Sequence, residues 1–499
     1  MGNFKPRSFR PGRAERDPSR ASRDGQGGDR NQGGQPGQQR QGGRPFRRDR
    51  RGGGHPPGPR GIGEGALKAH EGMLSTRTFT GPTGDRVRVI VLGGLEEVGR
   101  NCTLIEYKDD IILVDMGLQF PDEDMPGVDY IIPNMSYLKG KEKNVRGVII
   151  THGHYDHIGA IPHVIPHIGN PVVYALPIAA GIIKKRQTDF PTSKVNVKTI
   201  TIDTELQLGA FKVHFFHINH NIPDSAGIVI ETPAGTICHT GDWKFDYHPV
   251  GAPPADFHKI AKVGMDGVTL LMGDSTNASH AGHQTSEAVI GEEIRTILEK
   301  AKGRVIVGTF ASLLSRVKQI MEISESLGRK VALEGYSMKT NTEIARELGF
   351  IKINPKSIIP IEKVNDYPPE KITIICTGAQ GEQRAALSRI ANDEHRFVRI
   401  ERGDTVIFSS SVIPGNEASV QRLKDTFYRK RAKVIHKDIM DVHAGGHAKK
   451  EDIKLMLSSS CVKTPKWRTA WAGARKTSSS PTTGRSLSSG NRALHRTAS

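Results

Sequence analysis

The sequence feature that most constrains the fold is a cluster of histidines and an aspartate directly after an apolar run. The run VRGVIIT (145–151) has the β-branched content of a buried strand, and THGHYDHIGAIPH continues from its last residue. His152, His154, Asp156 and His157 therefore follow a predicted strand end. Zinc takes imidazole and carboxylate ligands, and such a segment can supply half of a two-metal site. A solvated polar loop would need the same residue types and spacing by coincidence.

Two later segments can complete this site. His220 follows the apolar run VHFFHI, and Asp242 follows the strand-like AGTICH. Either residue alone would be an ordinary turn residue, but active sites of α/β folds collect at strand ends, and an aspartate can bridge two cations. Asp115, which ends the run IILVD, is expected to hydrogen-bond the metal-binding loop rather than to bind metal. His163 and His167, four residues apart on a predicted helix, are interpreted as a polar helix face.

From about residue 85 the chain follows two successive α/β patterns. Short β-branched runs begin at RVRVIVLGG (86–94) and continue to DGVTLLMGD, with helical patterns such as TSEAVIGEEIRTILEKAKG later. From about residue 303, strands and helices alternate regularly, which predicts a largely parallel sheet. A two-part α/β enzyme is the simplest summary.

The positive charge lies at the two ends of the chain. Of the formal +18, residues 1–60 contribute 15 Lys/Arg against 5 Asp/Glu, and residues 461–499 contribute 8 Lys/Arg with no acid, so the body between is neutral. The Arg/Gly-rich N-terminal segment has too little apolar surface to offset the entropy of ordering, which predicts disorder. Such tails suit sequence-tolerant binding to RNA, although a solubilising linker has the same composition.

Cysteine spacing and hydropathy indicate the compartment. Cys102, Cys238, Cys376 and Cys461 form no CxxC pair, which fits a reducing environment. The N-terminus has no apolar stretch after its positive charge, and no run of eighteen apolar residues occurs in the sequence. We expect a cytoplasmic protein without a membrane partner.

A series of motifs resembles the metallo-β-lactamase fold and its nucleic-acid-processing branch, the β-CASP nucleases, most closely the ribonuclease J family. These motifs run in order from about residue 86 to about residue 457, which covers most of the predicted ordered chain. They are LGGLEEVGRNCTLIEY, ILVDMGLQFPDEDMPGVDYIIPN, THGHYDHIGAIPH, INHNIPDS, HTGDWKFD, GDSTNA, VGTFAS, CTGAQGE, FSSSVIPGNE and HAGGHA.

The resemblance implies an α/β fold in which an αββα metallo-β-lactamase sandwich is interrupted by a parallel-sheet β-CASP domain, with disordered basic tails. The implied domains are a disordered Arg/Gly-rich tail (1–80), the first part of the metallo-β-lactamase domain (85–283), the β-CASP domain (284–430), the return to the metallo-β-lactamase domain (431–457) and an aberrant basic tail (458–499).

The resemblance also implies roles for individual residues around two zinc ions, with Mn²⁺ or Mg²⁺ as alternatives. One zinc would be held by His152, His154 and His220. The other would be held by Asp156 and His157, with Asp242 between the two ions. Asp156 would also accept a proton from the nucleophile, His447 would contact the scissile phosphate, and Asp274 and Asp115 would support the site. The implied substrate contacts are Phe310, Ala311, Ser312, His443, Ala444, Gly445, Gly446 and His447.

The implied function is zinc-dependent hydrolysis of single-stranded RNA. The resemblance implies a 5′–3′ exonuclease that acts on 5′-monophosphorylated ends and can also cut internally. Its implied roles are rRNA maturation and mRNA decay. The physics agrees, because the negative charge of a phosphodiester repels hydroxide. Two cations neutralise that charge and supply an acidified water.

The sequence departs from the family pattern at three places. Gly445 replaces the usual serine of the HVSGHA motif, and Ser315 stands where relatives carry a histidine. After residue 457 the family's apolar strand, its last histidine ligand and its assembly domain are missing, and the only histidine is His495. This predicts a truncated or frame-shifted product rather than an authentic basic RNA-binding tail. The second metal site is then expected to bind more weakly, and homo-oligomerisation is in doubt.

Two other functions remain open from the sequence. An RNA-binding pseudoenzyme would keep the basic tails but have an incomplete metal site. A small-molecule thioester or lactam hydrolase of the same fold is disfavoured by the inserted α/β unit and by GDSTNA. Metal content and chelator-sensitive RNA cleavage separate the nuclease from both.

Overall fold

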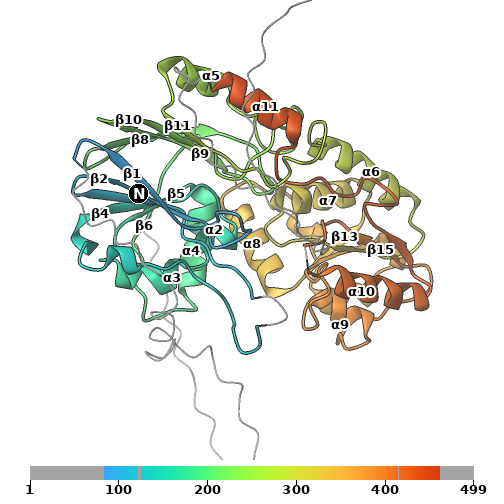
Figure 1. Ribbon diagram of the computed structural model, residues 1–499. Helices are drawn as coiled ribbons and strands as arrows, with labels where there is room; N and C mark the ends of the chain where they lie inside the picture. The colour runs from blue at the N-terminus through green and yellow to red at the C-terminus, as the bar shows by residue number, and fades with distance from the viewer. Residues whose placement is uncertain (1–83, 122–124, 414, 461–499) are drawn as a thin grey trace, which may run out of the picture. The chain divides into compact units, whose positions relative to one another are not determined.

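Three β-sheets and the helices that cover them form the part of the chain that the structure describes (Figure 1). This computed structural model describes residues 84–121, 125–413 and 415–460. The predicted N-terminal tail (1–80) and residues 461–499 of the predicted C-terminal tail lie outside the described residues. Residues 458 and 459 still belong to a helix, α11 (Lys450–Ser459).

Two of the sheets pack face to face. The first has the order β1-β2-β3-β4-β5-β6, antiparallel from β1 to β3 and parallel from β3 to β6. Its strands are β1 (Val87–Gly93), β2 (Cys102–Tyr107), β3 (Asp110–Val114), β4 (Val145–Ile149), β5 (Val173–Ala175) and β6 (Val197–Thr199). The second has the order β11-β10-β9-β8-β7 and comprises β7 (Leu206–Leu208), β8 (Phe211–His217), β9 (Ala226–Thr232), β10 (Gly235–His239) and β11 (Leu270–Met272).

Successive side chains of a strand point to opposite faces of its sheet, which explains how each sheet packs on both sides. Ile112 and Val114 of β3 share one buried cluster with Phe211 and Val213 of β8, which places that cluster between the sheets. The other face of the first sheet packs on α2 (Tyr155–Ile158), α3 (Ile161–Val164) and α4 (Pro177–Gln187). The outer face of the second sheet packs on α5 (Phe257–Asp266) and α11. This is the predicted αββα sandwich, and the fold class is confirmed.

The third sheet is entirely parallel, with the order β13-β14-β12-β15-β16. Its strands are β12 (Val305–Gly308), β13 (Lys330–Glu334), β14 (Ile372–Cys376), β15 (Thr405–Phe408) and β16 (Lys433–Ile435). One face packs on α6 (Glu287–Lys300), α7 (Leu314–Ser326) and α8 (Tyr336–Glu347), and the other on α9 (Ala386–Ala391) and α10 (Glu417–Arg429). The prediction of a largely parallel second unit is therefore confirmed.

Short 3₁₀ helices connect several of these elements. They are η1 (Ser136–Leu138), η2 (Glu142–Asn144), η3 (Ile165–His167), η4 (Pro355–Ser357), η5 (Ile361–Asp366) and η6 (Pro369–Lys371).

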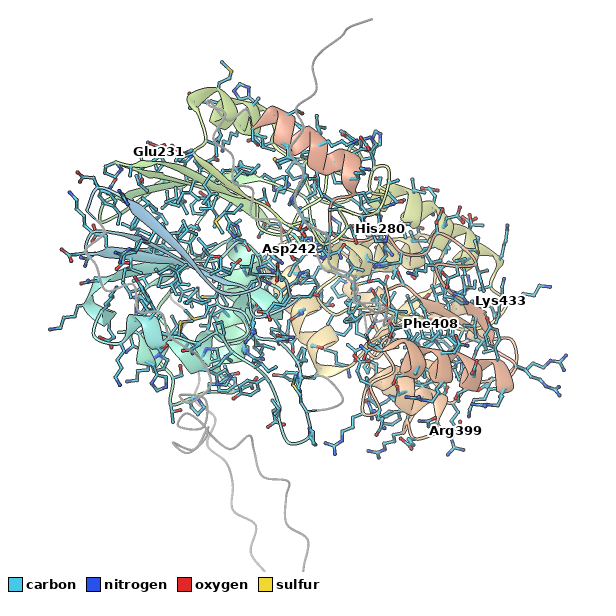
Figure 2. The ribbon with its side chains drawn as sticks, viewed as in Figure 1. Glu231, Asp242, His280, Arg399, Phe408 and Lys433 are labelled. Carbon is cyan, nitrogen blue, oxygen red and sulfur yellow. The ribbon has the colours of Figure 1, made fainter. Side chains whose placement is uncertain are left out.

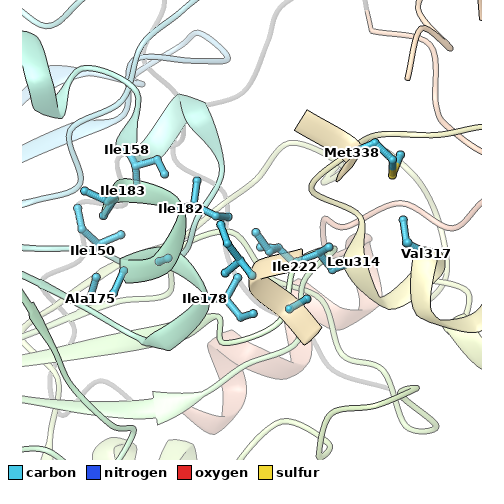
Figure 3. Packing of buried hydrophobic residues seen from close by; sticks show 14 of the residues in the cluster. Ile150, Ile158, Ala175, Ile178, Ile182, Ile183, Ile222, Leu314, Val317 and Met338 are labelled. Carbon is cyan, nitrogen blue, oxygen red and sulfur yellow. The ribbon is translucent and has the colours of Figure 1, made fainter. Parts of the chain in front are cut away.

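One hydrophobic cluster continues from the sandwich into the helices of the third sheet. It contains Ile178 and Ile182 of α4 together with Leu314 of α7 and Met338 of α8 (Figure 3). The absence of a side chain at Gly181 helps α4 approach α8, because a Cβ there would lie 2.7 Å from Cγ2 of Ile344. Apolar packing therefore holds α4 directly against the helices of the inserted unit.

The segment after the histidine cluster differs from the sequence prediction. A single helix carrying both His163 and His167 is wrong, because α3 ends at Val164 and η3 begins at Ile165. Pro162 lies in the first turn of α3, where a proline is tolerated, whereas Pro166 cannot donate the hydrogen bond that would continue α3 beyond Val164. The two histidines thus do not share one helix face.

Two further sequence predictions concern membranes and disulfides. None of the helices in the described ranges combines the length and apolar character needed to cross a bilayer. Cys102, Cys238 and Cys376 are buried free thiols. Cys461 lies outside the described residues.

Candidate metal centre

The ends of several strands bring the predicted ligands together. His152 and His154 follow β4, His220 follows β8, and Asp242 follows β10. Potential ligand atoms lie within 4.8 Å of one another in two groups, His152 with His154 and His220, and His152 with His157 and Asp242. Figure 2 shows Asp242 in the interior, between the sandwich strands and the helices of the third sheet. The loops after three different strands therefore converge on one place.

The first group is a set of neutral imidazoles. His154 Nδ1 lies 3.0 Å from His152 Nε2 and 3.1 Å from His220 Nε2. Burial and the neighbouring histidines hold the pKa of His152 and of His220 well below the ordinary value, and burial lowers the pKa of His154 to about 4. His220 Nδ1 donates to the carbonyl of Gly446 at 2.9 Å, so its Nε2 carries the lone pair. Three neutral imidazoles with converging ring nitrogens can turn lone pairs toward a cation such as zinc.

The second group combines one imidazole with carboxylates. His157 Nε2 lies 3.3 Å from Asp242 Oδ2 and 3.5 Å from Asp156 Oδ2. Although burial opposes it, the charges of Asp242, Asp156 and Asp115 raise the pKa of His157 well above its ordinary value. Asp156 belongs to neither of the two groups within 4.8 Å but contacts His157 directly. This concentration of negative charge also fits a cation.

Asp115 fixes the loop that carries the histidines. Its Oδ1 accepts from the backbone N–H of Thr151 at 2.8 Å, and its Oδ2 accepts from Thr151 Oγ1 at 2.8 Å and from His157 Nδ1 at 2.7 Å. The proton on Nδ1 leaves Nε2 of His157 directed at the carboxylates. Asp115 adopts a left-handed backbone conformation, with φ of 61°, so the turn after β3 is strained to hold it there.

Sequence reasoning missed two supporting residues. Thr151 Oγ1 donates to Asp115 Oδ2 and also lies 3.0 Å from His152 Nδ1. Asn101 Nδ2 lies 3.1 Å from His157 Nε2 and 3.2 Å from the carbonyl of Asp156. The position of Thr151 next to His152 was a signal, and Asn101 lies within the motif LGGLEEVGRNCTLIEY, although the residue type alone gives it no role.

His447 and Asp274 lie next to Asp242, and the His447 ring centroid is 5.2 Å from that of His220. His447 Nδ1 is 2.8 Å from Asp274 Oδ2 and 3.9 Å from Asp242 Oδ2. Despite burial, Asp274 and then Asp242 raise the pKa of His447 to about 9, while His447 lowers the pKa of Asp274 against its own burial. His447 is thus held as a cation, with Nδ1 paired to Asp274. Asp242, Asp274 and His447 form a third group within 4.8 Å.

The predicted substrate contacts fall in two loops. Phe310, Ala311 and Ser312 lie between β12 and α7 and are half-buried. The segment from His443 to His447 lies between β16 and α11. Within it, the two ring nitrogens of His443 are buried without a hydrogen-bond partner among the described residues, and burial beside Arg316 lowers the pKa of His443 to about 3. Ala444 is buried, whereas Gly445 is half-buried.

Comparison with known proteins matches both halves of this architecture. Residues 95–285 match the metallo-beta-lactamase superfamily, and residues 302–427 match the family described as Ribonuclease J, beta-CASP domain. The chain is 40% identical over 396 residues to Ribonuclease J of Thermus thermophilus, which covers 78% of this chain and 68% of that protein. The chain belongs to the ribonuclease J family. Membership makes it a metal-dependent ribonuclease of the metallo-β-lactamase and β-CASP type.

Other ribonuclease J proteins align over a similar stretch. Ribonuclease J 1 of Streptococcus pyogenes is 43% identical over 375 residues, covering 75% of this chain and 67% of that protein. Ribonuclease J of Helicobacter pylori is 41% identical over 373 residues, covering 74% of this chain and 54% of that protein. A solved structure of a protein of unknown function from Enterococcus faecalis shares the fold, with a TM-score of 0.55 at 17% identity over 74% of this chain and 91% of that one.

Proposed function

We propose that this chain hydrolyses single-stranded RNA with two zinc ions, as a 5′–3′ exonuclease that also cuts internally and prefers 5′-monophosphorylated ends. Its cellular roles would be rRNA maturation and mRNA decay. The observation that carries the proposal is the convergence of His152, His154 and His220 beside His157 and Asp242. Neutral imidazoles on one side and carboxylates on the other suit two adjacent cations.

We also propose the domain division that the resemblance implied. Residues 85–283 and 431–457 would build the metallo-β-lactamase domain, and residues 284–430 the β-CASP domain. The sheet order supports an inserted unit, because β12 to β15 lie within residues 284–430 and form one sheet that contains no strand of the other two. The same sheet continues to β16, so it ends at Ile435 rather than at residue 430.

In the proposed centre, His152, His154 and His220 would hold one ion, and Asp156 and His157 would hold the other, with Asp242 between the two ions. The ions would supply an acidified water and neutralise the charge that develops on the phosphate. Mn²⁺ or Mg²⁺ would be accepted by the carboxylate side more readily than by the three imidazoles.

The chain's own groups would carry the remaining steps. Asp156 lies at the edge of the centre, with its side chain one-third exposed, and would accept the proton of the attacking water. His447, held as a cation by Asp274, would donate a hydrogen bond from Nε2 to a non-bridging phosphate oxygen. Removing one such donor typically costs ~3 kcal/mol, about a hundredfold in rate. Phe310 to Ser312 and the 443–447 segment would contact the RNA next to the cleaved bond.

The test measures metal and cleavage together on the full chain. Zinc per chain would be measured by elemental analysis, and hydrolysis would be followed on 5′-monophosphorylated and 5′-triphosphorylated RNA with and without chelator. We expect bound zinc, chelator-sensitive cleavage, and faster cleavage of the monophosphorylated RNA. RNA binding without zinc or cleavage would favour the pseudoenzyme instead.

A matched pair of histidine variants assigns the site. His154→Ala removes a buried ligand, and we expect it to lower the zinc content and to reduce cleavage by about a hundredfold or more, since loss of ligands or their support commonly has effects of this size. His167→Ala removes an exposed histidine from the following segment and should leave both values unchanged. Equal behaviour of the two variants would reject the assignment.

A further inference from the structure

A buried chain of ion pairs lies beside the candidate metal centre and contains none of its ligands. Glu287, the first residue of α6, accepts from Arg316 NH2 at 2.5 Å and from Lys244 Nζ at 3.2 Å. The exposed fractions of the Arg316, Glu287 and Lys244 side chains are 0%, 5% and 1%. Asp246, 1% exposed, lies 3.5 Å from Lys244 Nζ and accepts from the backbone N–H of Glu287 at 2.9 Å. Burying these four charges is costly unless each has a partner of opposite charge, which each one has here.

One end of this chain holds the segment that carries His447. Arg316 NH1 donates to the carbonyl of Val442 at 2.7 Å and to Ser409 Oγ at 2.6 Å. Ser409 Oγ donates to the same carbonyl at 2.7 Å. Val442 directly precedes the 443–447 segment, so a guanidinium from α7 and a hydroxyl from the end of β15 both fix the point at which that segment begins.

The other end holds the segment that carries Asp242. Lys244 lies two residues after Asp242, and its backbone N–H donates to the carbonyl of Asn219, the residue before His220, at 2.8 Å. The carbonyl of Trp243 accepts from the backbone N–H of Ala448 at 2.6 Å. The residues next to His220, Asp242 and His447 are thereby joined to one another and, through Glu287, to α6 and α7.

The distances around His447 explain why the position of its segment matters for the reaction. His447 lies 3.9 Å from Asp242, and its ring must meet a phosphate oxygen while its Nδ1 stays on Asp274. A donor displaced by about 1 Å from the productive geometry can lose about a hundredfold in rate. Asp274 orients the ring, but nothing in that pair fixes where the backbone of the 443–447 segment begins.

We propose that Arg316 is a positioning residue for the ribonuclease reaction. Through Val442 it fixes the position of His447 relative to the metal centre. Through Glu287 and Lys244 it couples that position to the segment that carries Asp242. Arg316 is fully buried and is bonded to Glu287, Ser409 and Val442, none of which is a proposed metal ligand. It thereby makes the helices of the inserted unit part of the catalytic alignment. The inference rests on the proposed function, because His447 must contribute to the rate.

The test is a double-mutant cycle between Arg316 and His447 on the full chain. Arg316→Met keeps an unbranched apolar stem and removes the donors. If Arg316 acts through His447, we expect Arg316→Met to lower kcat by about tenfold or more in the wild-type background and by less than about twofold in the His447→Ala background. KM and the zinc content should stay close to wild type in both.

Arg304 provides the matched control. It is also a buried arginine of the inserted unit, paired bidentately with buried Asp404 at 3.1 and 2.7 Å and bonded to the carbonyl of Arg399 at 2.6 Å. Arg304→Met therefore removes a similar buried ion pair. We expect it to lower the unfolding temperature as Arg316→Met does, with kcat of the folded protein unchanged.

The outcomes separate the inference from the proposed function. Equal losses of kcat from Arg316→Met with and without His447, or the same kcat loss in Arg304→Met, would overturn the positioning role alone. Full activity of His447→Ala would overturn both the proposed role of His447 and the inference.

A milder variant keeps the test available if Arg316→Met does not fold. Ser409→Ala removes one hydroxyl from the Val442 carbonyl and leaves every charge in place. The same cycle with His447→Ala should show a smaller loss of kcat, about threefold, that disappears in the His447→Ala background, and an additive loss would overturn the proposal.

Discussion

At the scale of the residue, Gly446 brings a main-chain carbonyl into contact with a metal-binding imidazole. Its carbonyl accepts from His220 Nδ1 at 2.9 Å. A Cβ at Gly446 would lie 2.6 Å from Cε1 of His220 and 2.6 Å from Nδ2 of Asn221. Any side chain there would push His220 away from His154, so the glycine serves close approach rather than a special backbone angle.

Gly446→Ala is therefore expected to weaken zinc binding by about tenfold to a hundredfold, the usual cost of disturbing the support of a metal ligand. Competition with a chelator of known affinity measures this on the full chain. Gly445→Ala is the matched control, because the nearest atom to its Cβ is the end of the flexible Gln284 side chain, at 2.7 Å. Zinc affinity equal in the two variants would contradict the steric argument.

Asp115 supports the centre from a strained turn. It accepts three hydrogen bonds, two from Thr151 and one from His157 Nδ1. Asp115→Asn places an amide NH₂ against at least one of these donors, so the proton on His157 is no longer fixed. We expect zinc affinity to fall about tenfold or more, with the fold retained. Unchanged zinc content after dialysis against a weak chelator would show that Asp115 is not needed for this purpose.

At the scale of the element, periodicity predicts most strands and the long helices α6, α7 and α8. It fails for the segment from Ile161 to His167, where apolar residues at helical spacing are divided between two short helices, with Pro162 at the start of the first and Pro166 at the start of the second. The prolines were visible in the sequence, and giving them more weight than the apolar spacing would have avoided the error.

The start of α6 is an element whose stability should depend on pH. Arg316 and Lys244 lower the pKa of Glu287 to about 2 against its burial, from an ordinary value of 4.5. A lowered pKa in the folded state means that the ionised pair stabilises fully above pH 4.5 and that this contribution is lost as the pH falls toward 2.

Glu287→Gln is then expected to reduce the free energy of unfolding at neutral pH by about 3–5 kcal/mol, because buried Arg316 loses its carboxylate partner and Lys244 keeps only Asp246. The difference from wild type should shrink steadily below pH 4.5, which urea unfolding in excess chelator measures without a metal contribution. Glu451→Gln, which breaks an exposed pair with Lys454, should show little difference at any pH. A constant difference across this range would show that Glu287 is not ionised in the fold.

At the scale of the whole molecule, the sequence predicts the proposed metal ligands better than it predicts the buried residues that hold them in place. The ligands share residue types and strand-end positions, and the structure brings His152, His154, His157, His220 and Asp242 together. Lys244, Glu287 and Arg316 gave no such signal, because charged residues in helices and turns usually face solvent. Only the packing of α6 and α7 against the Asp242 and Val442 segments buries them.

The distribution of charge over the molecule makes the last prediction. Residues 1–60 hold 15 Lys/Arg against 5 Asp/Glu, whereas residues 61–460 hold 48 of each. Long-range attraction of RNA should therefore come from the ends of the chain, and the cleavage step from the neutral body. Changing every arginine of residues 1–60 to glutamine keeps the chain length and removes the contribution of the N-terminal end to this attraction.

We expect the glutamine variant to bind single-stranded RNA more weakly at low salt, with kcat at saturating RNA unchanged. The slope of log K against log salt concentration should fall in magnitude by ~0.7 for each phosphate that the protein no longer neutralises. The corresponding arginine-to-lysine variant keeps the charge and changes only the stacking surface, so it should keep the wild-type slope. If the glutamine and lysine variants have the same slope, residues 1–60 do not supply the RNA attraction, which then arises elsewhere in the chain.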